Sequence, residues 1–182
     1  MSCFLQDILY NNDMKKFEIR LLSEKFYEKY SKSIFSEIMD KGESRPYLVL
    51  LIEINNKTFG LPFRSNINHK YAFMIKNNRG LKEGIDFSKA VVLEKEDIGR
   101  NARLKSGNLK EVQKHIDLII AMFKKYLNQF IEVSKLPKRN VYQERTFNMS
   151  TLKYFVGMSP ELYKNIDEGV KTPTSELKET IK

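Results

Sequence analysis

The chain has 182 residues, of which 41% are hydrophobic, including 12 Phe and 9 Tyr, and this composition excludes a disordered polymer and predicts one domain with a hydrophobic core. Its 32 Lys and Arg outnumber its 23 Asp and Glu, and the formal net charge of +9 favours nucleic acid first and an anionic membrane surface second, against a merely soluble basic protein. The single cysteine, Cys3, excludes an internal disulfide, and no apolar run approaches the roughly 20 residues of a membrane helix, so we expect a cytoplasmic protein.

Residues 1–14 are interpreted as an extension ahead of the fold, without the pattern of a signal peptide. The apolar side chains from 17 to 21 alternate with polar ones and predict a half-buried strand. Ser23 is a suitable N-cap. The apolar residues after it recur at helical spacing and predict two short helices, with a break at 31–33 and an end at Gly42.

A long hairpin is predicted next. Residues 47–54 are almost all apolar, which is typical of a central strand covered on both faces. The pair Asn55-Asn56 tolerates the positive φ angles of a two-residue loop, so residues 58–63 are expected to return antiparallel. Pro62 lacks an N–H group, which places the end of this second strand at an edge or a bulge.

The rest of the fold is predicted from shorter patterns. Strands over 71–76 and 89–93 extend the hairpin into a strongly curved, partly barrel-like antiparallel sheet. Apolar residues with a 3.6-residue period predict one long helix over 109–133, packed on the sheet with a basic outer face. Beside that stripe, His115 is expected to be a surface or core-edge residue and not a ligand.

The C-terminal part is expected to hold a strand over 138–143, short helices over 150–155 and 159–169, and a polar tail over 170–182. The predicted fold class is therefore α+β, with a single compact domain over 15–169.

The loop after the hairpin holds the candidate functional side chains Arg64, Ser65, Asn66, Asn68, His69 and Lys70. The simplest alternative is a solvated loop with no special purpose. With two His, one Cys and no clustered acids, the chain offers no convincing metal site. It also lacks a glycine-rich phosphate loop and the elbow of a serine hydrolase, so we expect no cofactor.

Metal-free RNA cleavage fits these residue types, because the RNA supplies its own nucleophile in the 2′-OH. The protein must align that hydroxyl, stabilise the charge of the phosphorane with Arg or Lys, and manage two protons with Ser or His. The products would be a 2′,3′-cyclic phosphate and a 5′-OH. The same loop could also bind phosphate without cleaving anything.

The order of the segments resembles that of the toxins of type III toxin–antitoxin systems, the ToxN/AbiQ-like endoribonucleases, and is most similar to their CptN/TenpN branch. The resemblance runs from about Lys15 to about Tyr163. It rests on Arg45 ahead of LVLLIEI, on LPFRSN, on DFSKAVVL, on the predicted long helix and on FNMSTLKYF. The spacing from Arg45 to Ser65 fits the family pattern without a gap.

This resemblance implies a curved antiparallel sheet with helices and metal-independent cleavage of mRNA, preferentially at A-rich sites. It also implies inhibition by a repeated, pseudoknotted antitoxin RNA. The toxin would cut the precursor of that RNA and remain bound to the products in a closed protein–RNA assembly.

The resemblance also assigns roles. Ser65 falls on the family's loop serine and would orient the scissile phosphate or the 2′-OH, although it could be a simple turn residue. Arg45 and Arg64 would stabilise the phosphorane. Asn66-Ile67 replaces the Pro-Lys found elsewhere in the family, so His69 or Lys70 would supply the missing charge or proton carrier. Further RNA contacts are expected from Lys89, Asn66, Asn68, Lys41, Arg79, Lys110 and Lys114.

Several alternatives remain open at this point. Lys89 could be a solvated lysine at a strand edge, and Tyr47 could stack on a base, although a place in the core is favoured. The protein could be a non-catalytic RNA- or DNA-binding protein with the same basic loop. It could also use the 109–133 helix to recruit an acidic partner; strong salt dependence would favour either nucleic-acid function over a chiefly hydrophobic interface.

Overall fold

A seven-stranded antiparallel sheet with helices packed against it forms the part of the chain that the structure describes. This structure is a computed structural model, and it describes residues 17–31, 33–38, 47–76, 80–104 and 106–156. The strands are β1 Glu18–Leu22, β2 Leu48–Ile54, β3 Lys57–Arg64, β4 Ala72–Met74, β5 Gly84–Asp86, β6 Val91–Leu93 and β7 Ile98–Asn101. The helices are α2 Glu24–Lys29, α3 Ser106–Lys114, α4 Ile116–Lys135 and α5 Val141–Met149, with short 3-10 turns η1 Phe87–Lys89, η2 Lys95–Asp97 and η3 Thr151–Tyr154.

The hairpin of β2 and β3 is the centre of the sheet and confirms the sequence prediction. Its register runs from Val49 opposite Pro62 to Ile54 opposite Lys57. Asn55 and Asn56 have φ angles of 50° and 57°, the left-handed conformation that a two-residue hairpin loop requires. The strand β2 is buried along most of its length, as its apolar sequence predicts.

Strand β3 is not at an edge, and its register with β2 runs without a bulge up to Pro62, which corrects the expectation that Pro62 marks an edge or a bulge. On the side away from β2, β3 pairs with β6 through Thr58–Gly60 and with β5 through Phe63 and Arg64. Pro62 lies between these two pairings. The missing N–H therefore falls where β3 passes from one neighbour to the next, a position in which proline removes no ladder hydrogen bond on that side.

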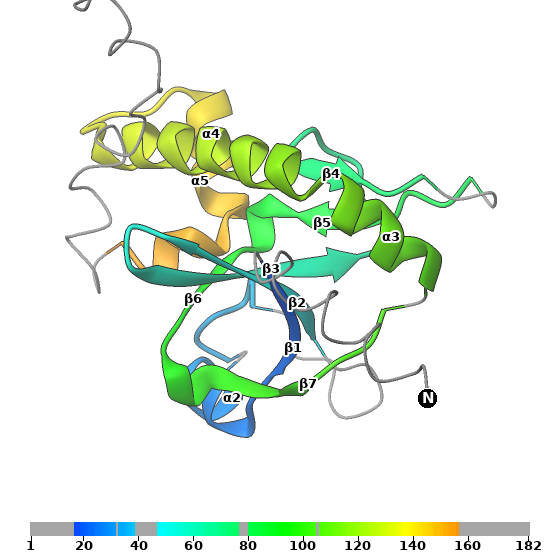
Figure 1. Cartoon of the computed structure of the whole chain (residues 1–182). Helices are drawn as coiled ribbons and strands as arrows, with labels where there is room; N and C mark the ends of the chain where they lie inside the picture. The colour runs from blue at the N-terminus through cyan, green and yellow to red at the C-terminus, as the bar shows by residue number, and fades with distance from the viewer. Residues whose placement is uncertain (1–16, 32, 39–46, 77–79, 105, 157–182) are drawn as a thin grey trace, which may run out of the picture.

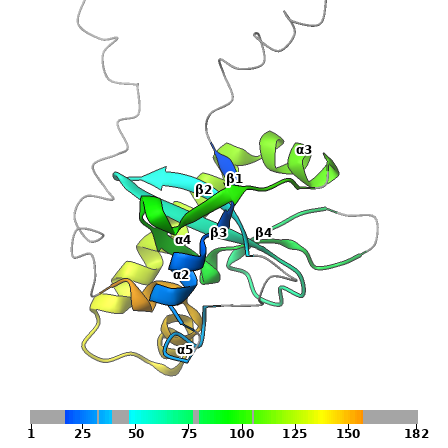
Figure 2. The same cartoon turned by 90° about the horizontal axis from the view of Figure 1, so that it is seen from below.

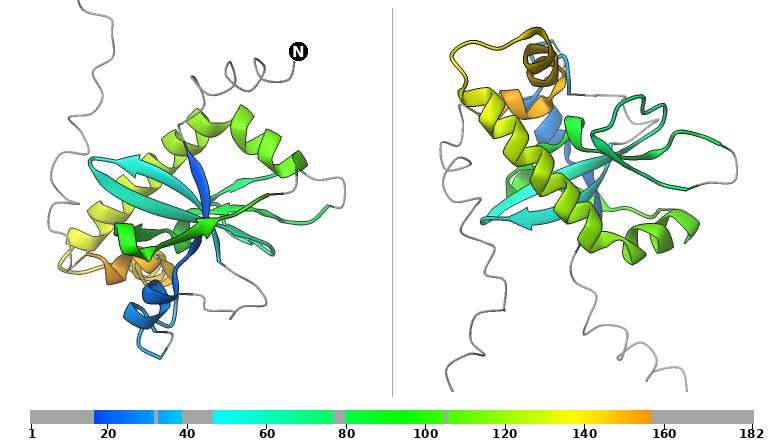
Figure 3. Two further views of the ribbon diagram at one scale, coloured as in Figure 1. Left: turned by 60° about the horizontal axis from the view of Figure 1, so that its bottom comes forward. Right: turned by 90° about the horizontal axis from the view of Figure 1, so that it is seen from above.

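The sheet is open in the described part of the chain. Its strand order is β4-β5-β3-β2-β1-β7, and no pairing joins β4 to β7 among the described residues, so the expected partial closure into a barrel is not shown. The helix α4 lies along one face of the β2–β3 hairpin (Figure 1; Figure 3, right). Seen from below, β1 and β2 lie in front of α4 (Figure 2).

Aromatic rings join α4 to the sheet. Phe123 of α4 lies 5.3 Å from the ring of Phe59 in β3 and 5.7 Å from that of Phe87 in η1. All three side chains are essentially fully buried, so their contacts remove a large apolar area from water. This packing fixes η1, which follows directly after β5, against the centre of the core.

The predicted 109–133 helix is two helices, α3 and α4. They are separated at His115, whose φ of −117° and ψ of 18° leave the helical region. The ring nitrogen Nδ1 of His115 lies 3.0 Å from the carbonyl oxygen of Glu111, in the last turn of α3. The apolar period continues across the break because Val112 of α3 and Ile116 of α4 both face the core.

Other corrections concern short segments. Residues 138–143 hold the start of α5 and not a strand, because Asn140 and Gln143 form a capping box that begins a helix. The expected helix after residue 33 is a series of turns up to residue 38. Lys89 lies in η1, ahead of β6, and the strands β5 and β7 were not predicted.

Two predictions at the helix ends are confirmed. Ser23 caps α2 by accepting a hydrogen bond from the amide of Phe26 at 3.2 Å, and η3 lies within the predicted 150–155 helix. The extension over 1–14, the 159–169 helix and the 170–182 tail lie outside the described residues. In the described chain, no helix combines the length and the apolar character that crossing a membrane requires.

Candidate functional site

The carboxylate of Asp86 is the centre of a polar cluster at the junction of β5 and η1. Asp86 is 0% exposed. Its Oδ2 accepts a hydrogen bond from Nη1 of Arg64 at 2.5 Å and lies 3.4 Å from Nε2 of His69. Its Oδ1 accepts hydrogen bonds from the amide and the hydroxyl of Ser88, at 2.9 and 2.7 Å. We call Arg64, His69, Asp86 and Ser88 the Asp86 cluster.

The partners of Asp86 outweigh the effect of its burial. Desolvation would raise the pKa of this carboxyl group. The hydrogen bonds from His69 and Ser88, together with the charges of His69 and Arg64, act in the opposite direction and lower the pKa of Asp86 below its ordinary value. The buried side chain is therefore a carboxylate at neutral pH, and it can hold the side chains of Arg64 and His69 at the surface.

The loop between β3 and β4 brings Arg64 and His69 together. Arg64 ends β3, where it pairs with Gly84 of β5. Asn66 then takes the left-handed conformation, with φ of 59°, and the amide of Ile67 donates a hydrogen bond to the carbonyl of Lys82 at 3.1 Å. With the buried Ile67 as an anchor, the chain returns so that His69 reaches the same carboxylate as Arg64.

Of the two ring nitrogens of His69, one contacts the Asp86 cluster and the other has no partner among the described residues. Its Nε2 lies 3.4 Å from Oδ2 of Asp86 and 3.5 Å from Oγ of Ser88. Its Nδ1 is buried and has no hydrogen-bond partner among the described residues. A carboxylate at one imidazole nitrogen fixes the orientation of the ring.

Arg64 also borders a cleft of about 280 Å³. The cleft is lined by Phe63, Arg64, Ser65, Ile75, Glu83, Gly84, Arg103, Leu104 and Asn108. The exposed Ser65 therefore lies beside the arginine, as the loop sequence suggests, but no contact joins it to Asp86 within the described chain. Arg103, just before α3, adds a second guanidinium group to this cleft.

Lys70 follows His69 in the chain and contacts two tyrosines. Its Nζ lies 5.4 Å from the ring centroids of both Tyr71 and Tyr142. The hydroxyl oxygens of these tyrosines are 2.8 Å apart. Hydrogen bonding and charge attraction with Tyr142 raise the pKa of Lys70, while the same lysine, with a further hydrogen bond from Tyr71, lowers the pKa of Tyr142.

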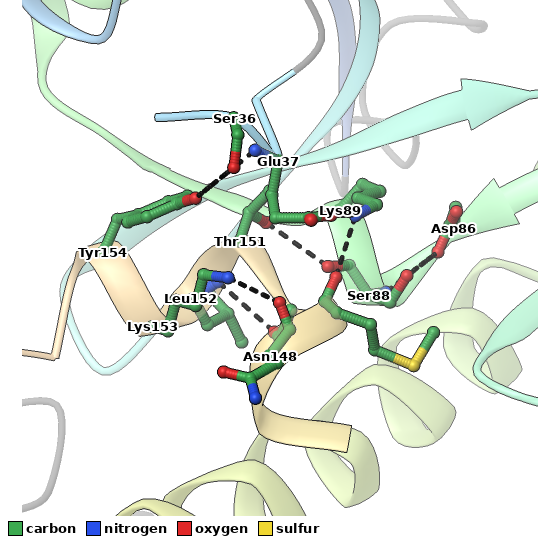
Figure 4. Close-up of polar contacts among 12 residues, drawn as sticks. Ser36, Glu37, Asp86, Ser88, Lys89, Asn148, Thr151, Leu152, Lys153 and Tyr154 are labelled. Atoms are coloured by element: carbon green, nitrogen blue, oxygen red, sulfur yellow. Dashed lines mark hydrogen bonds and ion pairs between the residues drawn. The ribbon is translucent and has the colours of Figure 1, made fainter. Parts of the chain in front are cut away.

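Lys89 points away from the cluster, although it follows Ser88 directly (Figure 4). Its side chain is 11% exposed, and its ammonium group forms an ion pair with Glu37 and donates a hydrogen bond to the carbonyl of Met149 at 2.8 Å. This group therefore joins three segments of the protein, and it is neither a solvated strand-edge lysine nor freely available to RNA.

Three of the other predicted residues have structural contacts. Asn66 supplies the left-handed turn, and the amide of Asn68 donates to the carbonyl of Asn66 at 3.4 Å while its oxygen accepts from Lys82 at 3.1 Å. Tyr47 is buried, as favoured, and its hydroxyl donates to the carbonyl of Lys89 at 3.3 Å. Burial raises the pKa of the Tyr47 hydroxyl and is the largest effect on that pKa.

The remaining predicted residues do not join the cluster in the described structure. Arg45, Lys41 and Arg79 lie outside the described residues. Lys110 and Lys114 are exposed on α3, the helix that also supplies Asn108 to the cleft. Among the described residues, no three His, Cys, Asp or Glu side chains come together as metal ligands would.

Sequence reasoning missed Asp86, Ser88, Arg103 and Tyr142. Asp86 and Ser88 belong to the DFSK segment, of which only the lysine was considered. The Asp-x-Ser spacing is a signal that could have been used, because an aspartate readily caps a turn by accepting from the residue two positions later. Nothing in the sequence around Tyr142 links it to the loop that holds Lys70.

Comparisons with known proteins give one informative result. No protein-family model matches the chain, and no curated protein matches it. A solved structure from a study of bacterial type III toxin–antitoxin systems, on selective toxin inhibition by a non-coding RNA pseudoknot, is similar with a TM-score of 0.56. The match has 15% sequence identity and covers 81% of this chain and 99% of that chain. The protein therefore shares its fold with a chain studied in a bacterial type III toxin–antitoxin system.

Proposed function

We propose that the protein is the toxin of a type III toxin–antitoxin system and acts as a metal-independent endoribonuclease. The observation that carries the proposal is the buried carboxylate of Asp86, which holds Arg64 and His69 side by side at the surface. The shared fold and the net charge of +9 support an RNA partner. Within that family, the proposal follows the resemblance in sequence order to the CptN/TenpN branch.

The proposed reaction is a transesterification within the RNA. The 2′-oxygen forms a bond to the adjacent phosphorus, and the bond from phosphorus to the 5′-oxygen of the next nucleotide breaks. A base accepts the proton of the 2′-OH, and an acid donates a proton to the departing 5′-oxygen. The products are a 2′,3′-cyclic phosphate and a 5′-OH; all their heavy atoms come from the RNA, and the proton accepted by the base balances the proton donated by the acid.

Arg64 is suited to stabilise the phosphorane. One guanidinium nitrogen, Nη1, is held by Asp86, and the other N–H donors of this 24%-exposed side chain can bind phosphate oxygens. Because the ion pair fixes the guanidinium before RNA arrives, little conformational freedom is lost at the moment of reaction. In this proposal Arg45 adds a second positive charge, and Ser65 orients the phosphate or the 2′-OH from the adjacent cleft.

His69 is the proposed proton carrier. Of the two candidates, its contacts favour it over Lys70, because Lys70 lies over the rings of Tyr71 and Tyr142. Asp86 is then a positioning residue that orients the imidazole of the 23%-exposed His69 through Nε2. The substrates would be mRNA and the precursor of the antitoxin RNA.

The proposed inhibitor is a pseudoknotted antitoxin RNA that occupies the same basic surface. In the solved structure with a similar fold, the toxin studied is inhibited by an RNA pseudoknot. We propose that cleaved antitoxin repeats and this protein form a closed assembly in the cytoplasm, with phosphate contacts from exposed lysines such as Lys110 and Lys114.

The test is to incubate the purified protein with RNA in EDTA and to identify the new ends. We expect cleavage with 2′,3′-cyclic phosphate and 5′-OH ends, lost in His69→Ala and Arg64→Ala. The matched control is His115→Ala, since His115 is the other histidine of the chain and lies between α3 and α4. Intact RNA that is nevertheless bound would instead support a non-catalytic RNA- or DNA-binding protein, and loss of cleavage on chelation would refute metal independence.

Ser65 is tested separately by expression in cells. If it orients the phosphate, Ser65→Ala relieves growth arrest while the purified variant remains folded. If a folded Ser65→Ala variant still arrests growth, Ser65 is only a turn residue and has no role in cleavage.

A further inference from the structure

An exposed tyrosine lies beside the proposed catalytic cluster and has no role in the reaction described above. Tyr142, in the first turn of α5, is 53% exposed, although its hydroxyl lies 2.8 Å from that of the buried Tyr71. The ring of Tyr71 is in turn 6.3 Å from the ring of His69. Tyr71 therefore connects the exposed ring to the site where the scissile phosphate would lie.

The surroundings of Tyr142 combine a ring face with positive charge. The Nζ of Lys70 lies 5.4 Å from its ring centroid. Tyr142 also lines a cleft of about 570 Å³ between α4 and α5, together with Gln129, Glu132, Val133, Leu136, Asn140, Gln143 and Thr146. The exposed Arg145 follows one turn later on α5, the spacing at which side chains share a helix face.

We propose that Tyr142 and Lys70 form a nucleotide-binding subsite for single-stranded RNA, with the base stacked on the exposed Tyr142 ring and the phosphate bound by Lys70. This proposal rests on the proposed function, since it places a neighbouring nucleotide of the same RNA beside His69. Every base has a π face, so stacking on an exposed ring holds the strand with little sequence preference. An adjacent ammonium group then binds the backbone phosphate.

The geometry favours an unpaired strand. In a duplex the base faces are already stacked on their neighbours, whereas an unpaired base can lie flat on an aromatic ring. The hydrogen bond between the hydroxyl groups of Tyr71 and Tyr142 fixes the Tyr142 ring, and Thr146 donates a hydrogen bond to the Tyr142 backbone carbonyl at 3.0 Å, which holds the start of α5. A ring fixed in this way loses little side-chain entropy when a base stacks on it.

The absence of tryptophan from the sequence gives a direct test. In Tyr142→Trp, the new indole is the only one in the protein, and a base stacked on it quenches its fluorescence. The probe is a short single-stranded oligonucleotide with 2′-O-methyl groups, which the proposed reaction cannot cleave. Quenching by the single strand and not by the corresponding duplex is expected. The matched control is Val141→Trp, because Val141 is the neighbouring residue of α5 and is 89% exposed.

Binding measurements give a second, independent readout. Tyr142→Ala is expected to weaken binding of the single strand by about 5- to 150-fold, the range that corresponds to stacking of one base, while Tyr142→Phe keeps the ring and stays near the wild type. Lys70→Ala is expected to reduce the slope of log affinity against log salt by about one phosphate contact.

The outcomes separate this proposal from the proposed function. The subsite is refuted, and the proposed endoribonuclease activity is not, under three results together. The wild-type protein cleaves RNA, the fluorescence of Tyr142→Trp is not quenched, and Tyr142→Ala binds the single strand with normal affinity. Quenching without any cleavage keeps the subsite and overturns the endoribonuclease. If Tyr142→Trp does not fold by circular dichroism, the comparison of the Ala and Phe variants decides.

Discussion

Replacing Asp86 with asparagine should destabilise the protein by about 3 kcal/mol at neutral pH. The buried carboxylate accepts from Arg64 at 2.5 Å and from the Ser88 amide and hydroxyl at 2.9 and 2.7 Å. Removing one partner of a buried ion pair costs about 3–5 kcal/mol. The lower end applies here, because Arg64 and His69 are 24% and 23% exposed and can regain water.

The effect should depend on pH in a defined direction. The pKa of Asp86 in the folded protein lies below its ordinary value of 3.8. The stabilisation from its charge is therefore fully present above that value and is lost as the pH falls through the folded-state pKa. The difference in unfolding free energy between the wild type and Asp86→Asn should accordingly be constant near neutrality and shrink below about pH 4.

Urea unfolding followed by circular dichroism measures this difference, with equal m-values as the sign that both variants unfold alike. Asp117→Asn is the control, since Asp117 is exposed in the first turn of α4, and it should cost less than about 1 kcal/mol. A loss below about 1 kcal/mol for Asp86→Asn, or a difference that grows in acid, would refute the assignment of Asp86 as a paired buried carboxylate.

Three further predictions concern other parts of the molecule. Gly84→Ala should cost about 1–3 kcal/mol or more in urea unfolding, because the new Cβ would collide with the backbone of Phe73, whereas Gly107→Ala, with open space at its position, should be neutral or stabilising by about 0.5–1 kcal/mol. Lys89→Met removes the contacts with Glu37 and the Met149 carbonyl and should lower the unfolding free energy by about 1–3 kcal/mol. It should leave the slope of log RNA affinity against log salt unchanged; a slope reduced by one phosphate contact would instead support RNA binding by Lys89. In a tyrosinate absorbance titration, the earliest transition should disappear in Tyr142→Phe, because hydrogen bonding to its neighbouring lysine lowers the pKa of Tyr142 below 10.0.

The parts of the fold that were predicted are those in which local signals agree. The β2–β3 hairpin combines a continuous apolar run with Asn55-Asn56, and both signals lie within one short stretch. The strand β5 has only three residues, and its identity as a strand comes from pairing with β3 and β4. Such pairing is a long-range property that periodicity in a short window does not contain.

The break at His115 was missed for a different reason. Both α3 and α4 turn their apolar faces to the same core, so the 3.6-residue period passes through the interruption without a change of phase. The capping box at Asn140 and Gln143, in contrast, is a local signal. It predicts the start of a helix where a strand was expected.

At the candidate site, the sequence predicts a role for the arginine and histidine of the loop but does not show which residue holds them together. Asp86 lies 22 residues after Arg64, and a buried carboxylate cannot be distinguished in sequence from an exposed one. Lys89 shows the opposite problem, since a lysine in a suggestive segment forms an ion pair with Glu37 inside the fold. Burial and pairing are tertiary properties, and both determine whether a charged side chain can reach RNA.

The change of neighbour along β3 has a consequence for the dynamics of the site. On one side of Pro62, β3 pairs with β2 and β6 in the centre of the core, and on the other side it pairs with the three-residue strand β5. Short strands with few ladder bonds open in local fluctuations, without unfolding of the whole domain. Amide hydrogens of β4 and β5 should therefore exchange with solvent sooner than those of the β2–β3 hairpin, so that this end of the sheet can open locally while the hairpin keeps its structure.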